Sequence, residues 1–414
     1  MFFYKLKNKI LISESKKKEL QEITEDKAKK SKYIIYALTQ INPLKSRRSF
    51  SISDSSLMFL KEEGIHLLQK PKKIDYDLSI WLKERIEEKR ITSLNTEYPN
   101  WQDVLTYEFP SRWKINIIGL GDVGGALLAG LRLLGEKYIK SIGIYDKNRN
   151  AIKRWELEAN QIFNPFTTQV YPEVHILDEE EIFNCDLFVF CATVGVPSLG
   201  EEQEDVRMKQ FEGNSKIISD YAQKAREKSF KGIFAVISDP VDLLCKSAFL
   251  ASNKNKRGKF DFKGLAAEQI RGYGLGVMHA RAIYYSKQFS ETIKYSQEGR
   301  AFGPHGRGLI IANSIEKYDK RLSEALTNKT LKANLEIRKT GFKPYVAPAL
   351  SSACFPIIAT ISEKWHYSAN FMGGVFMGAK NRLHKSGTEI ERLDLPAVLV
   401  KKIKASYKEL GNIL

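Results

Sequence analysis

A glycine-rich turn between a strand-like run and a helix-like run is the first feature that could do chemistry. Residues 115–118 are apolar, and the pattern Gly-x-Gly-x-x-Gly follows them. In such a turn the first glycine permits a tight bend, the second lets a pyrophosphate approach the backbone, and the third lets helix and strand pack closely. The free N–H groups of the helix N-terminus then bind the phosphates. The predicted phosphate-binding residues are Gly119, Gly121, Asp122, Val123 and Gly124.

An acidic residue follows at the position where a dinucleotide site needs one. A second strand-like run, 141–145, ends at Asp146, which is 22 residues after Gly124. A carboxylate there would accept the ribose hydroxyls and would repel a 2′-phosphate. The pattern predicts NAD rather than NADP as the cofactor, although Lys147 and Arg149 weaken that discrimination. A glycine-rich turn in some other α/β protein is the alternative interpretation.

Three later segments contain polar residues that suit the reduction of a carbonyl. Asp239 follows a strand-like run in Ser-Asp-Pro-Val-Asp, Arg281 lies in a helix opened by Gly-Tyr-Gly-Leu-Gly, and His305 lies in the turn Gly-Pro-His-Gly. In order and spacing these segments resemble the lactate/malate dehydrogenase family over roughly 113–414. Arg207 matches the cation of that family's mobile loop.

The resemblance implies roles for these side chains. The planar guanidinium of Arg281 would bind the substrate carboxylate through two hydrogen bonds. His305 would donate a proton to the carbonyl oxygen, and Arg207 would stabilise the negative charge developing there. Arg207 would close over the substrate with a flexible loop at 195–202, which is about five residues longer than the usual one. Each residue also has a structural interpretation. His305 could be a structural histidine, Arg281 could form an ion pair on its helix, and Arg207 could be an exposed charge without substrate contact.

The sequence departs from the family pattern around the substrate. Met278 stands where the family has the aspartate that orients its histidine, and Asp239 stands where it has an asparagine. Lys343 is a further cation at the entry to the helix that lines the family's substrate pocket. These changes argue against ordinary lactate or malate turnover and leave the cofactor half untouched.

Two hypotheses follow from these residues. In the first, the chain is an NAD-dependent oxidoreductase that acts on the C=O or C=N carbon of an unusual, carboxylate-bearing small molecule resembling a 2-oxo acid, with residues 1–110 helping to present or enclose it. In the second, it is a catalytically degraded NAD-binding relative whose residues 1–110 contact a protein or peptide. The retention of His305, Arg281 and Arg207 favours the enzyme. The family resemblance also implies a homodimer or homotetramer.

Alternating strand-like and helix-like runs position these residues. Apolar runs at 115–118, 141–145, 187–191 and 232–238 alternate with amphipathic stretches, which predicts a Rossmann-type doubly wound parallel sheet of the α/β class. We predict this NAD-binding domain at 111–250 and a mixed α+β catalytic domain at 251–414. Residues 1–110 form a predicted small α+β module, with a strand pair at 2–13, helices near 15–40, 54–69 and 77–91, and a linker at 93–110.

Composition narrows the class of partner and compartment. The 414 residues include 66 Lys and Arg against 49 Asp and Glu, but acidic residues interrupt the densest lysine run, at 16–32, so we predict a solvated helix face and no nucleic-acid binding. The uncharged stretch 344–362 is short for a membrane span and predicts a buried helix, so no membrane partner is expected. The four cysteines have no metal-like spacing, and the six histidines form no cluster, so we predict reduced thiols, no metal and a cytoplasmic location.

Overall fold

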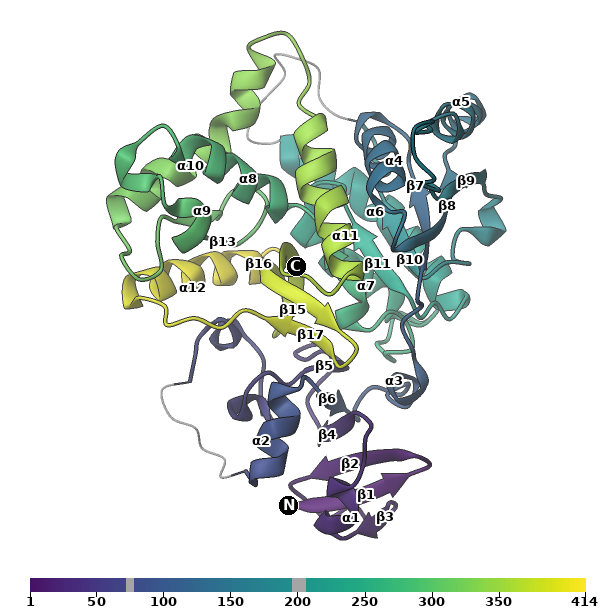
Figure 1. Cartoon of the computed structure of the whole chain (residues 1–414), viewed down its shortest axis with the longest axis vertical. Helices are drawn as coiled ribbons and strands as arrows, with labels where there is room; N and C mark the ends of the chain where they lie inside the picture. The colour runs from purple at the N-terminus through teal and green to yellow at the C-terminus, as the bar shows by residue number, and fades with distance from the viewer. Residues whose placement is uncertain (72–77, 196–205) are drawn as a thin grey trace.

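The glycine-rich turn lies at the carboxyl end of β7 (Trp113–Ile118), inside a nine-stranded sheet (Figure 1). A computed structural model describes residues 1–71, 78–195 and 206–414, with the side chains of 206–209 excluded. Six strands of the sheet run parallel, in the order β12-β11-β10-β7-β8-β9. The other five are β8 (Ile139–Tyr145), β9 (Glu173–Ile176), β10 (Leu187–Phe190), β11 (Ile233–Val236) and β12 (Ile270–Gly272). All four predicted strand runs are confirmed.

Helices cover both faces of this parallel sheet. On one face, α4 (Asp122–Leu134) packs its leucines against Ile115 and Ile117 of β7. On the other, α6 (Val206–Glu227) and α7 (Val241–Ser252) pack against Phe188 and Phe190 of β10. The predicted doubly wound sheet is therefore confirmed. α5 (Arg149–Asn160) follows β8.

The C-terminal part extends the same sheet with three antiparallel strands. They are β15 (His366–Met372), β16 (Val375–His384) and β17 (Gly387–Ile390). The helices are α8 (Leu275–Ser286), α9 (Tyr295–Glu298), α10 (Lys320–Arg338), a π-helical segment (Pro348–Cys354), α11 (Phe355–Ile361) and α12 (Ala397–Gly411), and a hairpin joins β13 (Arg300–Phe302) to β14 (Ile310–Ala312). The uncharged stretch at 344–362 thus forms mostly helix, as predicted, but the expected burial is incomplete because Val346 and Phe355 are 53% and 54% exposed. Within the described residues, no helix is both long and apolar enough to span a membrane.

Residues 1–110 form a second, six-stranded sheet of mixed direction, in the order β3-β1-β2-β4-β6-β5. Its strands are β1 (Phe2–Leu6), β2 (Lys9–Ser13), β3 (Gln21–Ile23), β4 (Ile35–Thr39), β5 (Ser49–Ser51) and β6 (Ile91–Asn95), and its helices are α1 (Glu25–Lys29), α2 (Ile80–Glu87) and α3 (Asp103–Thr106). We call residues 1–110 the N-terminal module. The predicted strand pair corresponds to β1 and β2.

The predicted helices of the N-terminal module are largely wrong. The stretch 15–40 contains β3, the short α1 and β4, so the lysine run at 16–18 lies in a turn and not on a helix. Every residue of β4 is buried between two parallel neighbours, and a continuous apolar run of this kind has no period that distinguishes strand from helix. The stretch 54–69 forms only two 3₁₀ turns, although Asp54 does cap the first by accepting from the Ser56 N–H.

The remaining predictions for the module hold in part. The helix expected at 77–91 is α2, whose N-cap is Ser79. The sequence also offers Asp77 as an N-cap, but that residue lies outside the described residues. The expected linker at 93–110 contains the end of β6 and α3.

The N-terminal module shares a hydrophobic core with the C-terminal strands. Ile12 and Leu68 of the module lie in one cluster with Met372, Met377 and Ile403. Arg48 donates to Glu268, which precedes the amino end of β12, at 3.0 Å. In Figure 1 the module occupies the lower part, beneath β15 and β17, whereas α4 and α10 stand above. The glycine-rich turn lies at the carboxyl ends of the parallel strands, whereas the N-terminal module lies toward their amino ends. The expectation that the module encloses the substrate is therefore wrong.

Candidate active site

The phosphate loop is built by close backbone packing. Gly119 adopts φ +93°, a conformation that other residues rarely take. A Cβ on Gly124 would lie 1.9 Å from the carbonyl oxygen of Gly119, whereas a Cβ on Gly121 would meet open space. The first and third glycines are thus needed for the bend and for helix packing, and the second leaves room for a phosphate group. Asp122 and Val123 begin α4, whose N–H groups face this room.

Asp146 lies beside this loop, half-buried after the end of β8. Its Oδ2 accepts from the Leu120 N–H at 2.7 Å and its Oδ1 accepts from the Asn148 N–H at 2.9 Å. The carboxylate is therefore fixed in place next to the glycine-rich turn. These residues fit a dinucleotide: the carboxylate of Asp146 would accept from the ribose hydroxyls, and the loop would hold the phosphates.

A cavity of about 410 Å³ extends from the phosphate loop along the carboxyl ends of β10, β11 and β12. It brings together the loop residues Gly121 to Gly124 with three of the predicted substrate-side residues, Asp239, His305 and Lys343. The crevice outside the carboxyl ends of parallel strands is the usual ligand site of such sheets. The sequence segments that we selected for their chemistry thus meet in one space.

His305 is oriented by a backbone carbonyl. Its Nδ1 lies 2.7 Å from the carbonyl oxygen of Gly274, and its own N–H donates to Oδ2 of Asp242 at 3.0 Å. A carbonyl oxygen only accepts, so Nδ1 bears a proton and Nε2 is the nitrogen left for chemistry. Gly274 must be a glycine here, because a Cβ would lie 2.8 Å from Cβ of His305. Ser352 Oγ also donates to this carbonyl, at 2.5 Å.

Two carboxyl groups lie near His305 in different environments. Oδ1 of Asp239 is 3.9 Å from Nε2 of His305, and the Asp239 side chain is 53% exposed. The side chain of Asp242 is buried, and burial raises the pKa of this carboxyl to about 7. Asn214 fixes the Asp239 backbone by donating to its carbonyl oxygen at 2.8 Å.

Met278 and Arg281 lie on α8, which begins directly after Gly274, the residue whose carbonyl orients His305. The Met278 side chain is buried, and Arg281 Nη1 lies 3.7 Å from its sulfur. Burial lowers the pKa of Arg281, which the charge of nearby Asp239 partly counteracts. Arg281 and Met278 are not among the described residues that line the cavity. Arg281 is therefore close to Asp239 without contributing to the cavity surface.

The structure adds lining residues that the sequence patterns missed. Asn334 and Arg338 reach the cavity from the last turn and a half of α10, and Tyr345 reaches it from the following loop. The one feature of the sequence that could have pointed to these residues is a long amphipathic helical pattern that ends just before Lys343. Arg207 lies in the first turn of α6, its side chain outside the description, and of the predicted loop at 195–202 only residue 195 is described.

The four cysteines are unpaired thiols, two of them fully buried. Burial raises the pKa of Cys191, beneath the phosphate loop, to about 12, and that of Cys354 to about 12 as well. Thiols of this kind are poor nucleophiles.

The segment that contains the phosphate loop also matches a known protein family. Residues 113–261 match the family described as lactate/malate dehydrogenase, NAD binding domain. Residues 113–261 therefore form an NAD-binding domain of the lactate/malate dehydrogenase type. The cofactor of this domain is NAD. The family match begins at residue 113, so the N-terminal module lies outside it.

Individual relatives are distant. L-lactate dehydrogenase of Treponema denticola is 28% identical over 202 residues, which are 49% of this chain and 58% of that protein. A probable malate dehydrogenase of Campylobacter jejuni is 24% identical over 312 residues, 71% of this chain and 97% of that protein. The solved minor L-lactate dehydrogenase of Enterococcus mundtii superposes with a TM-score of 0.60 at 19% identity, covering 73% of this chain and 98% of that one. Malate dehydrogenase of Cryptosporidium parvum gives 0.57 at 18%, with coverages of 73% and 98%. The structural likeness establishes the fold.

Proposed function

We propose that this chain is an NAD-dependent oxidoreductase that transfers hydride between NADH and the C=O or C=N carbon of a 2-oxo-acid-like substrate. The observation that supports it most is the orientation of His305, with Nδ1 on the Gly274 carbonyl and Nε2 beside Asp239 in the cavity that begins at the phosphate loop. When bound, the cofactor supplies the hydride. We propose domain boundaries of 1–110, 111–250 and 251–414 for this enzyme.

His305 would act as the proton donor in the reducing direction. The imidazolium gives the Nε2 proton to the substrate heteroatom as the neighbouring carbon accepts hydride, and the neutral ring keeps its Nδ1 proton on Gly274. The carbonyl thus performs the orienting role that the family gives to an aspartate at the position of Met278. It brings no negative charge, so stabilisation of the imidazolium falls to Asp239 on the other nitrogen.

Asp239 would also select the substrate. A carboxylate near the reacting heteroatom repels the alkoxide that forms when a simple 2-oxo acid is reduced, whereas it attracts a cationic C=N group. Arg281 is the proposed partner of the substrate carboxylate, although it is not one of the described residues that line the cavity. Arg207 is the proposed cation near the reacting oxygen, and Lys343 is a further cation on the cavity wall. We also propose that the chain forms a homodimer or homotetramer, for which the family resemblance is the support. We propose a cytoplasmic location as well.

NADH oxidation by the purified full chain tests this function. The substrates are pyruvate, oxaloacetate and a panel of 2-oxo acids, each with and without ammonium or methylamine to form the imine. We expect turnover with the amine present, and we expect His305→Asn to reduce it by about 10² to 10⁴ while NADH binding stays unchanged.

The absence of turnover across the panel in the unmutated chain would contradict the proposal. It would favour the other hypothesis, an NAD-binding relative without catalysis, for which the loss of the family aspartate at Met278 is the supporting observation. Equal rates in the unmutated chain and His305→Asn would contradict the assigned proton donor.

A further inference from the structure

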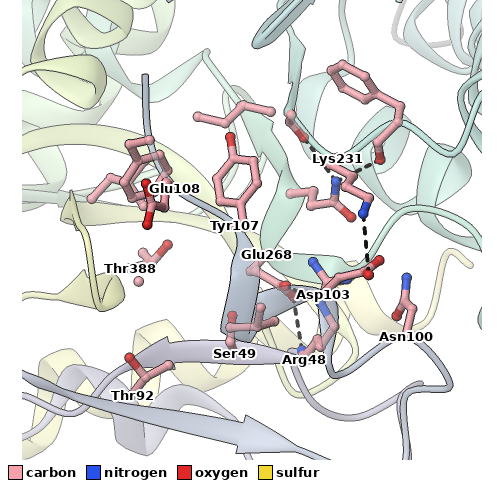
Figure 2. Close-up of a pocket in the computed structure, with 18 of the residues that line it drawn as sticks. Arg48, Ser49, Thr92, Asn100, Asp103, Tyr107, Glu108, Lys231, Glu268 and Thr388 are labelled. Carbon is pink, nitrogen blue, oxygen red and sulfur yellow. Dashed lines mark hydrogen bonds and ion pairs between the residues drawn. The ribbon is translucent and has the colours of Figure 1, made fainter. Parts of the chain in front are cut away.

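A second cavity, of about 650 Å³, lies between the N-terminal module and the NAD-binding domain (Figure 2). Its walls come from β5, β6 and α3 of the module, from the segment that joins α6 to β11, and from the β16–β17 hairpin. It borders Gly232 and Gln269, at the amino ends of β11 and β12, and among the described residues none lines both this cavity and the one at His305. We call it the module cavity. Its volume is in the range of small-molecule sites.

A buried arginine forms part of the module cavity wall. Arg271 is 1% exposed, and its Nη1 donates to Oδ1 of Asn370 at 3.3 Å and to Oδ1 of Asn381 at 3.2 Å. Its Nη2 donates to Thr388 Oγ1, and its buried Nε has no hydrogen-bond partner in the described protein. Three neutral oxygens therefore hold a full positive charge, with no carboxylate at ion-pair distance within the described residues. A buried cation in this state is costly unless an anion comes near.

The other charged residues of the module cavity leave a positive surplus. Six further Lys and Arg side chains line it against three acids, and one of the six, Arg226, is paired with Asp261 outside the lining at 2.7 Å. Glu268 is paired with Arg48 at 3.0 Å, and Asp103 with Lys231 at 3.4 Å, as Figure 2 shows. After these pairs, the described residues include no ion-pair partner for Lys9, Lys263 or Lys385. Glu108 is the one remaining acid of the lining.

The rest of the module cavity surface is aromatic or neutral and polar. Tyr36, Tyr107 and Phe230 supply ring surface, and Ser49 and Thr92 face the same space from the module. The side-chain oxygen of Asn100 is buried and accepts no hydrogen bond from the described residues. Figure 2 places Asn100 on the side of the cavity next to Asp103 and opposite Thr92.

We propose that the module cavity binds a small organic anion with an aromatic body. Arg271, Lys263 and Lys385 supply the charge that attracts the anionic group, and the rings cover the apolar body. The Asn100 oxygen accepts a hydrogen bond from an N–H or O–H of the ligand. Carboxylate, sulfonate and phosphate groups share this chemistry. This proposal is independent of the reaction at His305, since the two cavities use different residues.

Fluorescence titration with 8-anilinonaphthalene-1-sulfonate tests the proposal on the full chain. The probe is an aromatic anion with one N–H donor, and saturating NADH removes any binding at the nucleotide site. We expect one NADH-insensitive site per chain. Lys263→Glu with Lys385→Glu, both at exposed positions, should raise its Kd at least about fivefold, and Glu108→Gln should lower it about twofold.

Two controls distinguish binding in the module cavity from nonspecific binding of the probe to the protein. Lys401→Glu with Lys404→Glu changes the net charge equally at exposed positions of α12, and it should leave the Kd unchanged. The neutral analogue N-phenyl-1-naphthylamine has the same body without the sulfonate, and it should bind at least about tenfold more weakly than the anion.

Three results would overturn the proposal. They are the loss of all probe binding in saturating NADH, equal weakening by the α12 control pair, and equally tight binding of the neutral analogue. The opposite signs expected for the lysine pair and for Glu108→Gln keep the test decisive, because partial unfolding would move both variants in one direction.

Discussion

Nε2 of His305 and Oδ1 of Asp239 lie 3.9 Å apart on the wall of the cavity at the carboxyl ends of the parallel strands. The carboxylate thus lies on the Nε2 side of the imidazole, opposite the nitrogen that contacts the Gly274 carbonyl. Because the Gly274 carbonyl already fixes Nδ1, the acid at 239 is free to act on substrate charge and not on the ring tautomer.

Replacing this acid should change substrate preference. Asp239→Asn removes the repulsion of an alkoxide and restores the family residue, so we expect pyruvate or oxaloacetate reduction to rise at least about tenfold, which corresponds to about 1.4 kcal/mol of transition-state stabilisation. Turnover of a C=N substrate should fall in the same variant. Steady-state NADH oxidation measures both rates.

The double variant Met278→Asp with Asp239→Asn extends this test by returning both positions to the family pattern. We expect its rate with pyruvate or oxaloacetate to equal or exceed that of Asp239→Asn. Two results would contradict the idea that the acid at 239 replaces the family aspartate. One is brisk reduction of pyruvate or oxaloacetate by the unmutated chain. The other is a folded double variant whose rate does not exceed that of the unmutated chain.

Cofactor selectivity should depend on Asp146. We expect NADH to bind at least about tenfold more tightly than NADPH, because the carboxylate beside the loop repels a 2′-phosphate. Asp146→Asn should narrow this gap, and its amide oxygen can still accept from the Leu120 N–H, so the loop is preserved. Fluorescence titration of both nucleotides gives the ratio, and equal affinities in the unmutated chain would refute the assignment.

Stability should depend on pH through Asp242. Burial raises the pKa of this carboxyl to about 7, so between about pH 4 and pH 7 the folded chain keeps a proton that the unfolded chain releases. The free energy of unfolding therefore falls as pH rises through this window and levels above it. Asp242→Asn should remove this contribution, gaining up to about 4 kcal/mol relative to the unmutated chain between pH 4 and pH 8.

Urea unfolding at several pH values measures that difference. Asp220→Asn, at an exposed position of α6, is the matched control and should follow the unmutated chain at every pH. A difference that does not vary with pH would show that Asp242 is ionised throughout.

The ion pair between Arg47 and Glu63 should stabilise the N-terminal module from within. Both side chains are at most 3% exposed, with Nε of Arg47 2.8 Å from Oε2 of Glu63. Glu63→Ala leaves a buried guanidinium without its anion, so we expect a loss of about 3 to 5 kcal/mol in the free energy of unfolding. Glu22→Ala, which breaks an exposed pair with Lys16, should cost less than about 1 kcal/mol. Equal costs for the two variants would contradict a stabilising role of the buried pair.

The sequence was sufficient for features that depend on neighbouring residues. The glycines of the phosphate loop and the strand runs of the parallel sheet were predicted correctly, because local spacing alone specifies a tight turn and an alternating βαβ order. The same spacing located Asp239 and His305, which the structure then placed in one cavity. Local patterns failed at β4, where burial on both faces removes the period on which such a prediction depends.

Only the tertiary structure decided which group orients His305. Its partner is a backbone carbonyl 31 positions away, which no pattern of side chains can reveal. From the sequence alone, the methionine at the position of the family aspartate suggested that His305 had no orienting partner. The same holds for the N-terminal module. Its sequence contained no recognisable chemistry, and its place at the amino ends of the strands follows from apolar surface shared with β15, β16 and α12. Long-range packing of this kind fixes where a module lies, because burial depends on surfaces that meet only after the chain has folded.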